Sequence, residues 1–490
     1  MKVSIAQLNP RLGDFTYNKE KIREAIKLAL RDQSQILIIP FGSISGFPQG
    51  NLMASEDFRV AIQNAREELA LETKDTELSV FVEGQEILTK GIVSREGFSQ
   101  EIPDHTHLPL PAIFNQNNYD IFVNLGPKIF EKNRPEAHEM ELKLLANEKK
   151  SWVFDINLAG ATDEILFTGL SSITNPEGKI IARLKYAQED FITVDLESSN
   201  TYPVHEIPAG EEILRQTIVQ GIRDYFLKNH FSKILVSVSG GIDSALVLVL
   251  AVEAVGAEKV HAVYLPSKFS SDISKNGAQK ICDNLNVSLN HISIESLHKS
   301  YIQELSFLKD GNTIWEENIQ ARIRGNIVMS IANAEGSLVL ATGNKTEASV
   351  GYCTLYGDMC GGFAPISDLL KTEVRALCRY INTISNKEII PEITITRPPS
   401  AELNENQIDE NSLPNYEFLD QVLFLHCEEG LDYPQICDRL ERKEDVLKIF
   451  TLLYTSSYKR KQSPTGLKIS KRYFGLDWHI PTSVGLWFKQ

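Results

Sequence analysis

The chain has 490 residues, with 50 Lys and Arg against 65 Asp and Glu, a formal net charge of −15 and 42% hydrophobic residues. This length allows two or three domains with cores of their own, and the globular composition excludes a small disulfide scaffold. Because nucleic acids and anionic membranes attract clusters of Lys and Arg, the acidic balance argues against both as partners. Met1–Asp14 lacks the pattern of a signal peptide, and no run approaches the roughly 18 apolar residues of a membrane span, so we expect a cytoplasmic protein.

Strand-like and helical segments alternate in the first part of the chain. We expect strands at Val3–Leu8, Gln35–Ile39, Asp120–Leu125, Trp152–Asn157, Lys179–Leu184 and Phe191–Leu196, and helices around Ile22, Ala25, Ile26 and Ala29 and at Pro135–Lys149. This alternation indicates an α/β domain. A segment with Pro203 and Pro208 and no apolar periodicity follows, so we assign residues 1–197 to a first domain, 198–210 to a linker and 211–490 to a second domain.

The second part begins with a predicted helix, Glu211–Asn229, and a nearly continuous apolar strand, Lys233–Val238, of the kind buried on both faces in a parallel sheet. Further strands are expected at Val260–Leu265, Leu289–Ile294 and Ser337–Thr342. The pattern predicts a doubly wound parallel sheet, whose ligands bind at the carboxyl ends of the strands.

The string Ser-Gly-Gly-Ile-Asp-Ser at residues 239–244 directly follows the first of these strands and precedes the apolar helix Ala245–Val255. Adjacent glycines allow successive N–H groups and the helix N-terminus to converge on an anion, which predicts a phosphate-binding loop. The string lacks the Gly-Lys-Ser/Thr of a Walker loop and the third glycine of a dinucleotide fingerprint.

The loop resembles the pyrophosphatase loop of enzymes that use ATP to adenylylate a substrate, and later blocks resemble NAD synthetases of the two-domain, glutamine-dependent type. These blocks are Glu316–Arg324 (EENIQARIR), Ala341–Glu347 (ATGNKTE), Gly351–Asp358 (GYCTLYGD), Asp368–Val374 (DLLKTEV), Pro399–Leu403 (PSAEL), Gln407–Pro414 (QIDENSLP) and Tyr458–Pro464 (YKRKQSP). The resemblance covers essentially residues 211–490 and implies a sheet like that of the adenine nucleotide alpha hydrolases.

The resemblance also implies roles for individual residues. Asp243 and Glu347 would hold Mg²⁺, which prefers one or two carboxylates with phosphate oxygens. The ATP contacts would be Ser237, Ser239, Gly240, Gly241, Asp243, Ser244, Thr342, Lys371 and Ser400, and the deamido-NAD contacts Asn318, Arg324, Glu347, Asp358 and Lys459. Asp243, Glu347, Lys371 and Asp358 are the catalytic candidates, with Lys371 neutralising the leaving pyrophosphate and Asp358 a candidate base. Within a chain of charge −15, the basic triplet Lys459-Arg460-Lys461 is placed to grip phosphates.

The implied reaction has two steps. The nicotinate carboxylate of deamido-NAD attacks the α-phosphorus of MgATP, giving an acyl adenylate and pyrophosphate, and ammonia then converts the adenylate to NAD and AMP. Positioning and neutralisation of phosphate charge can supply most of the rate.

Residues 1–197 resemble the nitrilase-like glutaminase domain of the larger NAD synthetases, an α-β-β-α sandwich. The matching stretches are Ala6–Pro10 with Gly13-Asp14, Gly46-Phe47-Pro48, Leu108-Pro109 with Ile113-Phe114, and Val153–Phe167. That family splits glutamine with a Glu base, a Lys and a Cys nucleophile.

The catalytic positions of this first domain do not match. Phe41 stands where the Glu is expected and His105 where the Lys is expected, and no Cys precedes Cys282. The chain runs from Tyr119 almost directly into a strand, which indicates that the segment carrying the nucleophile is deleted. Ser43 and His105 have no convincing partner as replacements, so the sequence predicts an inactive, architectural domain.

The sequence offers no convincing metal site built from Cys or His. The six cysteines contain no CxxC pair, which predicts reduced, mostly buried thiols instead of disulfides or a zinc site; they are Cys282, Cys353, Cys360, Cys378, Cys427 and Cys437. His105 and His107 lie in a Pro-rich stretch, which is typical of a surface loop.

The leading hypothesis is a ligase that uses ammonia directly to form NAD. Three alternatives stay open: a glutamine-dependent enzyme that receives ammonia from a separate glutaminase, an enzyme that amidates nicotinate mononucleotide, and a non-catalytic nucleotide-binding assembly subunit. The NAD synthetase resemblance implies a homodimer or a larger homo-oligomer.

Overall fold

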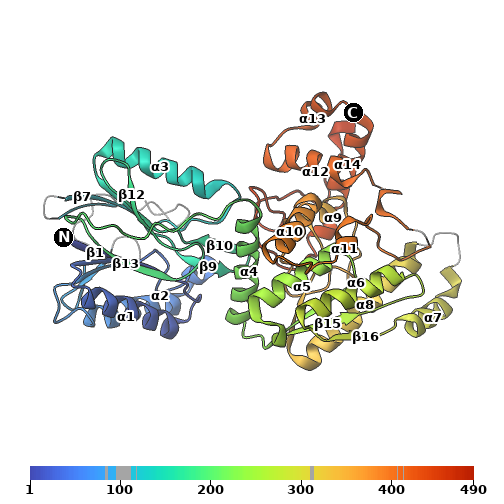
Figure 1. Cartoon of the computed structure of the whole chain (residues 1–490), viewed down its shortest axis with the longest axis horizontal. Coiled ribbons are helices and arrows are strands. Elements are labelled where there is room, and N and C mark those ends of the chain that lie inside the picture. Colours follow the sequence, from blue (N-terminus) through green and yellow to red (C-terminus); the bar gives the residue numbers. More distant parts are fainter. Residues whose placement is uncertain are drawn as a thin grey trace. The chain divides into compact units, whose positions relative to one another are not determined.

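The computed structural model describes residues 1–82, 86–94, 112–116, 119–308, 314–405, 407–411 and 413–489, without the side chains of 112–116, 119, 120 and 410. Contacts divide the chain into two compact units, Met1–Ala209 and Gly210–Gln490 (Figure 1).

Two sheets form the centre of the first unit. One has the strand order β13–β1–β2–β3–β4–β5 and the other β12–β11–β8–β7–β6, while β9 and β10 form a separate hairpin. Their bounds are β1 (Lys2–Gln7), β2 (Ile36–Ile38), β3 (Ser79–Val82), β4 (Glu86–Thr89), β5 (Ile92–Ser94), β6 (Ala112–Gln116), β7 (Tyr119–Asn124), β8 (Trp152–Asp155), β9 (Ala159–Thr162), β10 (Ile165–Thr168), β11 (Ser172–Thr174), β12 (Ile180–Arg183) and β13 (Asp190–Asp195).

Apolar side chains from both sheets meet in one core, where Ile5 and Phe81 of the first sheet join Phe154 and Ile173 of the second. Helices cover the two outer faces (Figure 1): α1 (Phe15–Arg31) and α2 (Glu56–Leu71) pack on the six-stranded sheet, and α3 (Arg134–Lys149) packs on the five-stranded sheet. The first unit is therefore an α-β-β-α sandwich, and this part of the predicted fold class is confirmed.

The second unit contains a four-stranded sheet of order β16–β15–β14–β17, in which every pairing is parallel. Its strands are β14 (Lys233–Ser237), β15 (Val260–Tyr264), β16 (Leu289–His291) and β17 (Ser337–Leu340). The helices are α4 (Gly210–Lys228), α5 (Ile242–Val255), α6 (Asp272–Leu285), α7 (Glu295–Glu304), α8 (Ile314–Glu335), α9 (Lys345–Val350), α10 (Lys371–Ile384), α11 (Glu392–Thr396), α12 (Tyr416–Leu423), α13 (Tyr433–Leu440), α14 (Lys443–Thr455) and α15 (Ser457–Arg460).

The chain order of this sheet reverses between β14 and β17, since successive strands first extend outward to β16 and the chain then returns to the other side of β14. Such a switch point opens a crevice at the carboxyl ends of the two strands, where ligands bind in doubly wound sheets. The doubly wound parallel sheet is confirmed, and the segments that follow β14 and β17 are the places to look for chemistry.

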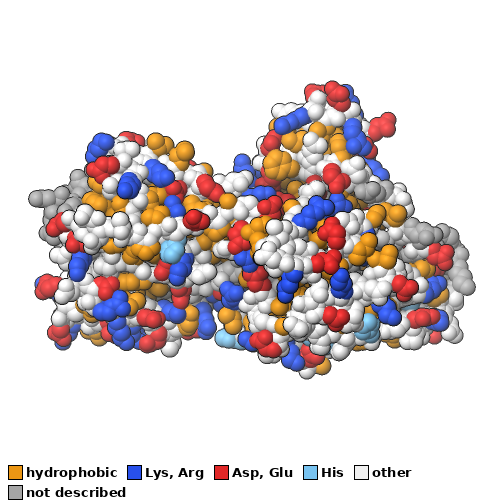
Figure 2. All heavy atoms as spheres, in the orientation of Figure 1, with side chains coloured by type: hydrophobic (Ala, Val, Ile, Leu, Met, Phe, Trp, Pro, Cys, Tyr) orange, Lys and Arg blue, Asp and Glu red, His pale blue; other side chains and the backbone are white. Residues whose placement is uncertain are grey.

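The charged side chains, the cysteines and the lengths of the helices were compared with the expectations from the sequence. Acidic and basic side chains are interspersed over the face seen in Figure 2. Four of the six cysteines, Cys282, Cys378, Cys427 and Cys437, are buried, as expected for mostly buried thiols. Among the described residues, no helix combines the length and the apolar character needed to cross a bilayer.

Candidate active site

A tight loop follows β14, whose last residue is Ser237, and leads into α5. The Ser239 N–H donates to Ser244 Oγ at 3.2 Å, the Gly241 N–H donates to Ser239 Oγ at 3.2 Å, and Ser244 Oγ donates to the Gly241 carbonyl at 3.0 Å. Gly240 has φ +81°, and a Cβ there would lie 2.1 Å from the Ser274 carbonyl oxygen. Only glycine fits this approach to α6, so the sequence forces the compact turn expected of a phosphate-binding loop.

Arg397 and Glu402 fix this loop against α6. The sequence had not indicated these contacts. The Arg397 guanidinium donates to the Gly240 carbonyl at 3.0 Å and to Ser274 Oγ at 2.8 Å. Glu402 accepts from Ser274 Oγ at 2.6 Å and lies 3.6 Å from Arg397. Ser400, an expected ATP contact, donates to the Gln407 carbonyl at 2.5 Å. The sequence could have indicated the pairing of Arg397 with Glu402, because these opposite charges lie on either side of Pro398-Pro399.

Three of the predicted catalytic residues meet in one cluster at the switch point. Lys371 Nζ lies 2.5 Å from Asp243 Oδ2 and 3.0 Å from Glu347 Oε1. Asn344 donates from Nδ2 to Asp243 Oδ1 at 2.8 Å. The side chains come from the starts of α5, α9 and α10 and the residue before α9, so helix N-termini position the whole group.

Local capping explains why Glu347 is held in place. Asn344 is the N-cap of α9, and its Oδ1 accepts from the Glu347 N–H at 2.9 Å. Glu347 Oε2 in turn accepts from the Asn344 N–H at 3.3 Å, which completes a capping box. Asn344 therefore touches both carboxylate residues of the cluster.

Burial and charge shift the proton affinities of this cluster. Burial alone would lower the pKa of the Lys371 ammonium, but the carboxylates of Asp243 and Glu347 outweigh it and raise the pKa above the ordinary lysine value. Burial and the neighbouring Asp243 charge raise the pKa of Glu347 against the opposing effect of Lys371. Lys371 is thus a permanent cation between two acidic groups.

Asp420 of α12 fixes the start of α10. Its carboxylate accepts from the Thr372 N–H at 2.8 Å and from Thr346 Oγ1 at 2.5 Å, and the Lys371 N–H donates to Thr346 Oγ1 at 2.9 Å. Burial raises the pKa of Asp420 to about 6. One carboxylate therefore joins the helices that carry Glu347 and Lys371, another contact that the sequence did not indicate.

Two predicted substrate residues lie together beside Thr354. The Thr354 N–H donates to Asp358 Oδ1 at 2.7 Å, and Thr354 Oγ1 donates to Asn318 Oδ1 at 2.8 Å. Burial raises the pKa of Asp358 to about 6. At neutral pH this carboxyl group is mostly ionised and close enough to titration to accept a proton.

Arg324 and Lys459 bind backbone carbonyls. Arg324 Nε donates to the Leu265 carbonyl at 2.8 Å, and burial lowers the pKa of its guanidinium to about 10. Lys459 Nζ donates at 2.8 Å to the carbonyls of Gly351 and Cys353, directly after α9. A cation beyond a helix C-terminus satisfies free carbonyl groups, and the role of Lys459 in binding deamido-NAD stays a prediction. Thr342 lies in the half-buried segment between β17 and α9.

Lys345 is a buried anchor that the sequence left without a role. Its side chain is 2% exposed, and Nζ lies 2.9 Å from Asp368 Oδ1, 3.1 Å from Glu428 Oε1 and 2.6 Å from Ser470 Oγ. The contact with Ser470 ties the first residue of α9 to a segment 125 residues further along the chain.

The donor set at the switch point fits a metal ion. Asp243 and Glu347 present hard carboxylate oxygens to one shared cation, at present an ammonium. Within the described parts of the chain, no group of three or more His, Cys, Asp or Glu side chains is arranged to hold a metal. The remaining ligands of an ion at this pair would have to come from phosphates or water.

In the first unit, an apolar side chain stands at the position where the resemblance requires a base. Phe41 packs against the core between the sheets, with its ring centroid 5.9 Å from that of Phe47. Buried Ser43 donates from Oγ to the Pro40 carbonyl at 2.7 Å, so its hydroxyl is engaged with its own turn. His105, His107 and the Leu108-Pro109 pair lie outside the described residues.

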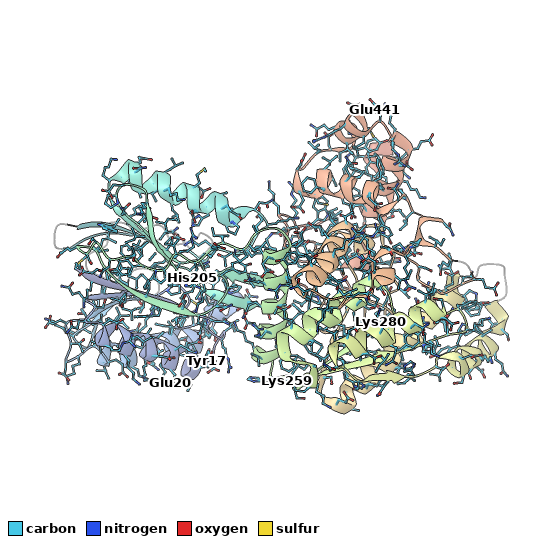
Figure 3. The ribbon with its side chains drawn as sticks, viewed as in Figure 1. Tyr17, Glu20, His205, Lys259, Lys280 and Glu441 are labelled. Atoms are coloured by element: carbon cyan, nitrogen blue, oxygen red, sulfur yellow. The ribbon has the colours of Figure 1, made fainter. Side chains whose placement is uncertain are left out.

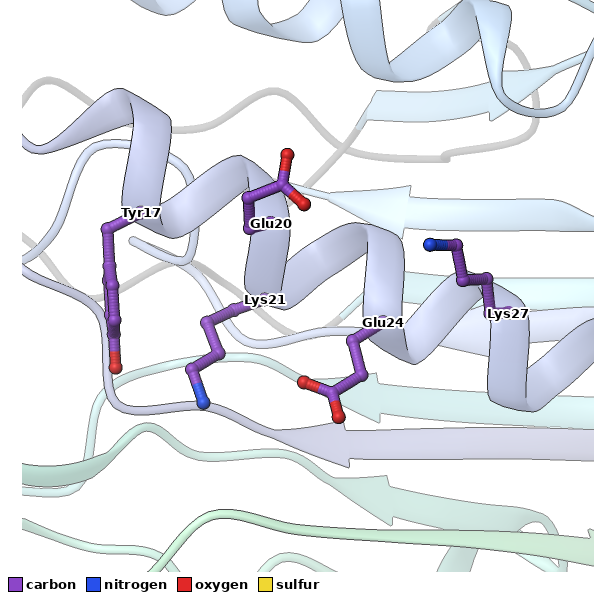
Figure 4. Close-up of a pocket in the computed structure, with 5 residues that line it drawn as sticks. All are labelled: Tyr17, Glu20, Lys21, Glu24 and Lys27. Carbon is purple, nitrogen blue, oxygen red and sulfur yellow. The ribbon is translucent and has the colours of Figure 1, made fainter.

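A shallow hollow runs along α1, lined by Tyr17, Glu20, Lys21, Glu24 and Lys27 (Figure 4). All five side chains come from one helix, and Lys21 pairs with Glu189 at 2.7 Å. The hollow gathers no groups from different elements, so we assign it no chemical role.

Known proteins resemble this chain over its full length. The profile of the family described as NAD synthase matches residues 214–463. The glutamine-dependent NAD(+) synthetases of Thermotoga maritima and Aquifex aeolicus are each 33% identical, with coverage of 98% and 99% of both chains, respectively. Both alignments run over 564 positions, more than this chain has residues, so each relative carries residues without a counterpart here.

Two solved structures share the fold along the whole chain. The glutamine-dependent NAD+ synthetase of Acinetobacter baumannii, determined with ADP, has 30% identity and a TM-score of 0.74, and the match covers 98% of each chain. The glutamine-dependent NAD(+) synthetase of Cytophaga hutchinsonii has a TM-score of 0.83 at 18% identity, covering 98% of this chain and 97% of the other, which shows the fold alone.

Proposed function

The chain belongs to the NAD synthase family, and we propose that it forms NAD from deamido-NAD, ATP and ammonia taken directly from solution. Members of this family are ligases that form a carbon–nitrogen bond. The observation that supports the ligase chemistry here is the cluster of Asp243, Glu347 and Lys371 beside the loop at residues 239–244. Anion-binding backbone groups and fixed cations stabilise the charge that develops during acyl adenylate formation.

In the proposed first step, the loop N–H groups and the start of α5 bind the triphosphate. The nicotinate carboxylate attacks the α-phosphorus, the bond to the β-phosphate oxygen breaks, and pyrophosphate leaves. Lys371 neutralises charge that develops on the leaving group. Mg²⁺ held by Asp243 and Glu347 would add further charge neutralisation on the phosphates.

In the proposed second step, ammonia attacks the carbonyl carbon of the adenylate and AMP leaves. The nitrogen must lose a proton, and Asp358 is the candidate acceptor because its pKa of about 6 leaves it ionised at neutral pH. Asn318 is joined to Asp358 through Thr354, so these residues would bind the same part of the substrate.

Ammonia is proposed as the nitrogen source because the first unit has lost the groups that split an amide. No Cys occurs before Cys282, and Phe41 takes the position of the base. A thiolate is the nucleophile on which the glutaminase route depends. The relatives carry positions that this chain lacks, as a deleted segment requires.

The test is NAD formation by purified protein with MgATP and deamido-NAD, supplied either with ammonium or with ammonia-free glutamine. We expect product with ammonium only, and comparable rates with both would refute the ammonia proposal. Nicotinate mononucleotide serves as the competing substrate. A separate glutaminase chain is the second candidate nitrogen source, because the relatives are glutamine-dependent. If it is correct, a partner glutaminase with glutamine should give a faster reaction than the same concentration of free ammonium.

The metal and catalytic roles are tested by Asp243→Asn and Glu347→Gln. Each removes one negative charge from the cluster with little change in shape. We expect both to abolish pyrophosphate release, a loss on the order of several kcal/mol of transition-state stabilisation. An unchanged circular dichroism spectrum is the control, and wild-type pyrophosphate release would contradict the assignment.

A further inference from the structure

We propose that the Lys371 ammonium occupies the cation position between Asp243 and Glu347 and yields it only to a metal ion that arrives with nucleotide phosphates. This inference rests on the proposed function, because it assigns the metal ion to these two carboxylates. It adds an order of events. The metal ion replaces the Lys371 ammonium between the carboxylates, and the released ammonium then binds a phosphate oxygen of the nucleotide.

The geometry of the three side chains supports this exchange. Lys371 Nζ lies 2.5 Å from one oxygen of Asp243 and 3.0 Å from one oxygen of Glu347, so it bridges them as a bound cation would. The other oxygen of each carboxylate is already bound by Asn344, through its Nδ2 and its backbone N–H. The oxygens that remain for a metal are therefore the same two that hold the ammonium.

Exposure indicates the direction from which a second cation can approach. The Lys371 side chain is 2% exposed, whereas Asp243 and Glu347 are 16% and 19% exposed. The aromatic face of Tyr416 lies 5.4 Å from Nζ, at a distance where a ring attracts a cation. Solvent reaches the carboxylates while the ammonium stays covered, so an arriving ion meets the ligands directly.

Charge balance explains why a metal ion alone is disfavoured. With both carboxyl groups ionised, the two carboxylates and one ammonium carry a net charge of −1. Adding a divalent ion would give +1, with two cations in direct competition for the same oxygens. A triphosphate supplies the missing negative charge and further oxygen ligands, which Mg²⁺ requires beyond one or two carboxylates. The long, flexible lysine stem then allows the ammonium to turn to a phosphate oxygen.

The experiment measures Mn²⁺ binding by electron paramagnetic resonance, without nucleotide and with a non-hydrolysable ATP analogue. Lys371→Gln removes the competing cation at similar length. We expect this variant to bind Mn²⁺ alone at least about tenfold more tightly than wild type, which equals about 1.4 kcal/mol. We also expect the analogue to strengthen Mn²⁺ binding less in the variant than in wild type, because the released ammonium is missing.

Controls separate this exchange from a general loss of charge. Lys371→Arg keeps a cation and should bind free Mn²⁺ as weakly as wild type does. Lys280 of α6, labelled in Figure 3, pairs with Glu388 at 2.8 Å, and Lys280→Gln should leave Mn²⁺ binding unchanged. Adding Asp243→Asn to Lys371→Gln should abolish the gained affinity.

Equal or weaker binding of Mn²⁺ alone by folded Lys371→Gln would overturn the proposal. If that variant does not fold, the wild-type protein still tests the proposal. Tight binding of Mn²⁺ by wild type without nucleotide, with no increase when the ATP analogue is added, would contradict the exchange. The binding assay is independent of NAD formation. Failure of the ligation assay with intact Mn²⁺ exchange would therefore count against the proposed function alone.

Discussion

Replacing Lys345 by Met tests how strongly the active-site helix α9 depends on its buried anchor. The change keeps the length of the side chain but removes a cation whose Nζ lies 2.9 Å from Asp368, a carboxylate that is itself fully buried. Removing one partner of a buried ion pair costs about 3 to 5 kcal/mol, since the other charge is left uncompensated. Asp368 keeps the Ile469 N–H at 2.8 Å and the Ser470 N–H at 2.7 Å, so we expect the lower end of this range.

Differential scanning calorimetry measures this loss. Domains of about 150 to 250 residues lose roughly 2 to 4 °C in melting temperature for each kcal/mol, and the unit Gly210–Gln490 is larger still. We therefore expect its transition to move down by about 6 °C. Because Glu347 follows two residues after Lys345 on α9, kcat should also fall.

Two controls accompany this variant. Lys299 forms an exposed pair with Glu295 on α7, and Lys299→Met should leave the melting temperature unchanged. Adding Asp368→Asn to Lys345→Met removes the stranded charge and should recover part of the lost stability. A loss below about 1 kcal/mol in the single variant would refute the view that this ion pair anchors α9.

Three further predictions concern the loop, the first unit and the domain organisation. Arg397→Lys replaces the two guanidinium nitrogens that bind the Gly240 carbonyl and Ser274 by a single ammonium nitrogen. Steady-state kinetics should show a raised KM for ATP with the KM for deamido-NAD unchanged, and an equal rise in both would contradict this. Burial lowers the pKa of His138, but the hydrogen bond and the charge of Asp155, together with a hydrogen bond to Glu141, outweigh it and raise the pKa. The contribution of His138 to stability is therefore complete below about pH 6.5 and is lost as pH rises through the raised pKa. Chemical denaturation of wild type should show this decline and His138→Gln should lack it. Truncation to residues 211–490 should lower thermal stability or oligomer size by size-exclusion chromatography, and an unchanged truncated protein would contradict a structural role for the first unit.

Apolar patterning predicted β1, β2, β7, β8, β12 and β13 of the first unit and all four strands of the sheet in the second unit. It missed β3 and β11, which supply Phe81 and Ile173 to the core between the two sheets of the first unit. The predicted strand Lys233–Val238 corresponds to β14 (Lys233–Ser237), and the predicted helix Pro135–Lys149 corresponds to α3 (Arg134–Lys149). The hairpin of β4 and β5 was missed, although Lys90 and Gly91 both have positive φ, as a tight two-residue turn requires. Its strands are too short to show a clear period.

The site could be predicted only as separate residues. Resemblance singled out Asp243, Glu347 and Lys371, but nothing in the sequence showed that one ammonium bridges both carboxylates. That contact joins residues 128 positions apart. Arg397 and Asp420 were missed for the same reason, because a charged residue shows no partner until the chain folds.

The capping box of α9 has a consequence for the choice of ion. Glu347 uses Oε2 to close the helix end, and Asp243 uses Oδ1 to accept from Asn344, so each carboxylate has one oxygen left. In the proposed metal site, each carboxylate of such a pair would offer an ion one oxygen. Mg²⁺ is small and accepts this arrangement with water and phosphate oxygens, whereas Ca²⁺ takes about six to eight oxygens and often grips a carboxylate by both. The hydrogen bonds at the start of α9 would thus favour Mg²⁺ over Ca²⁺ at this pair of carboxylates.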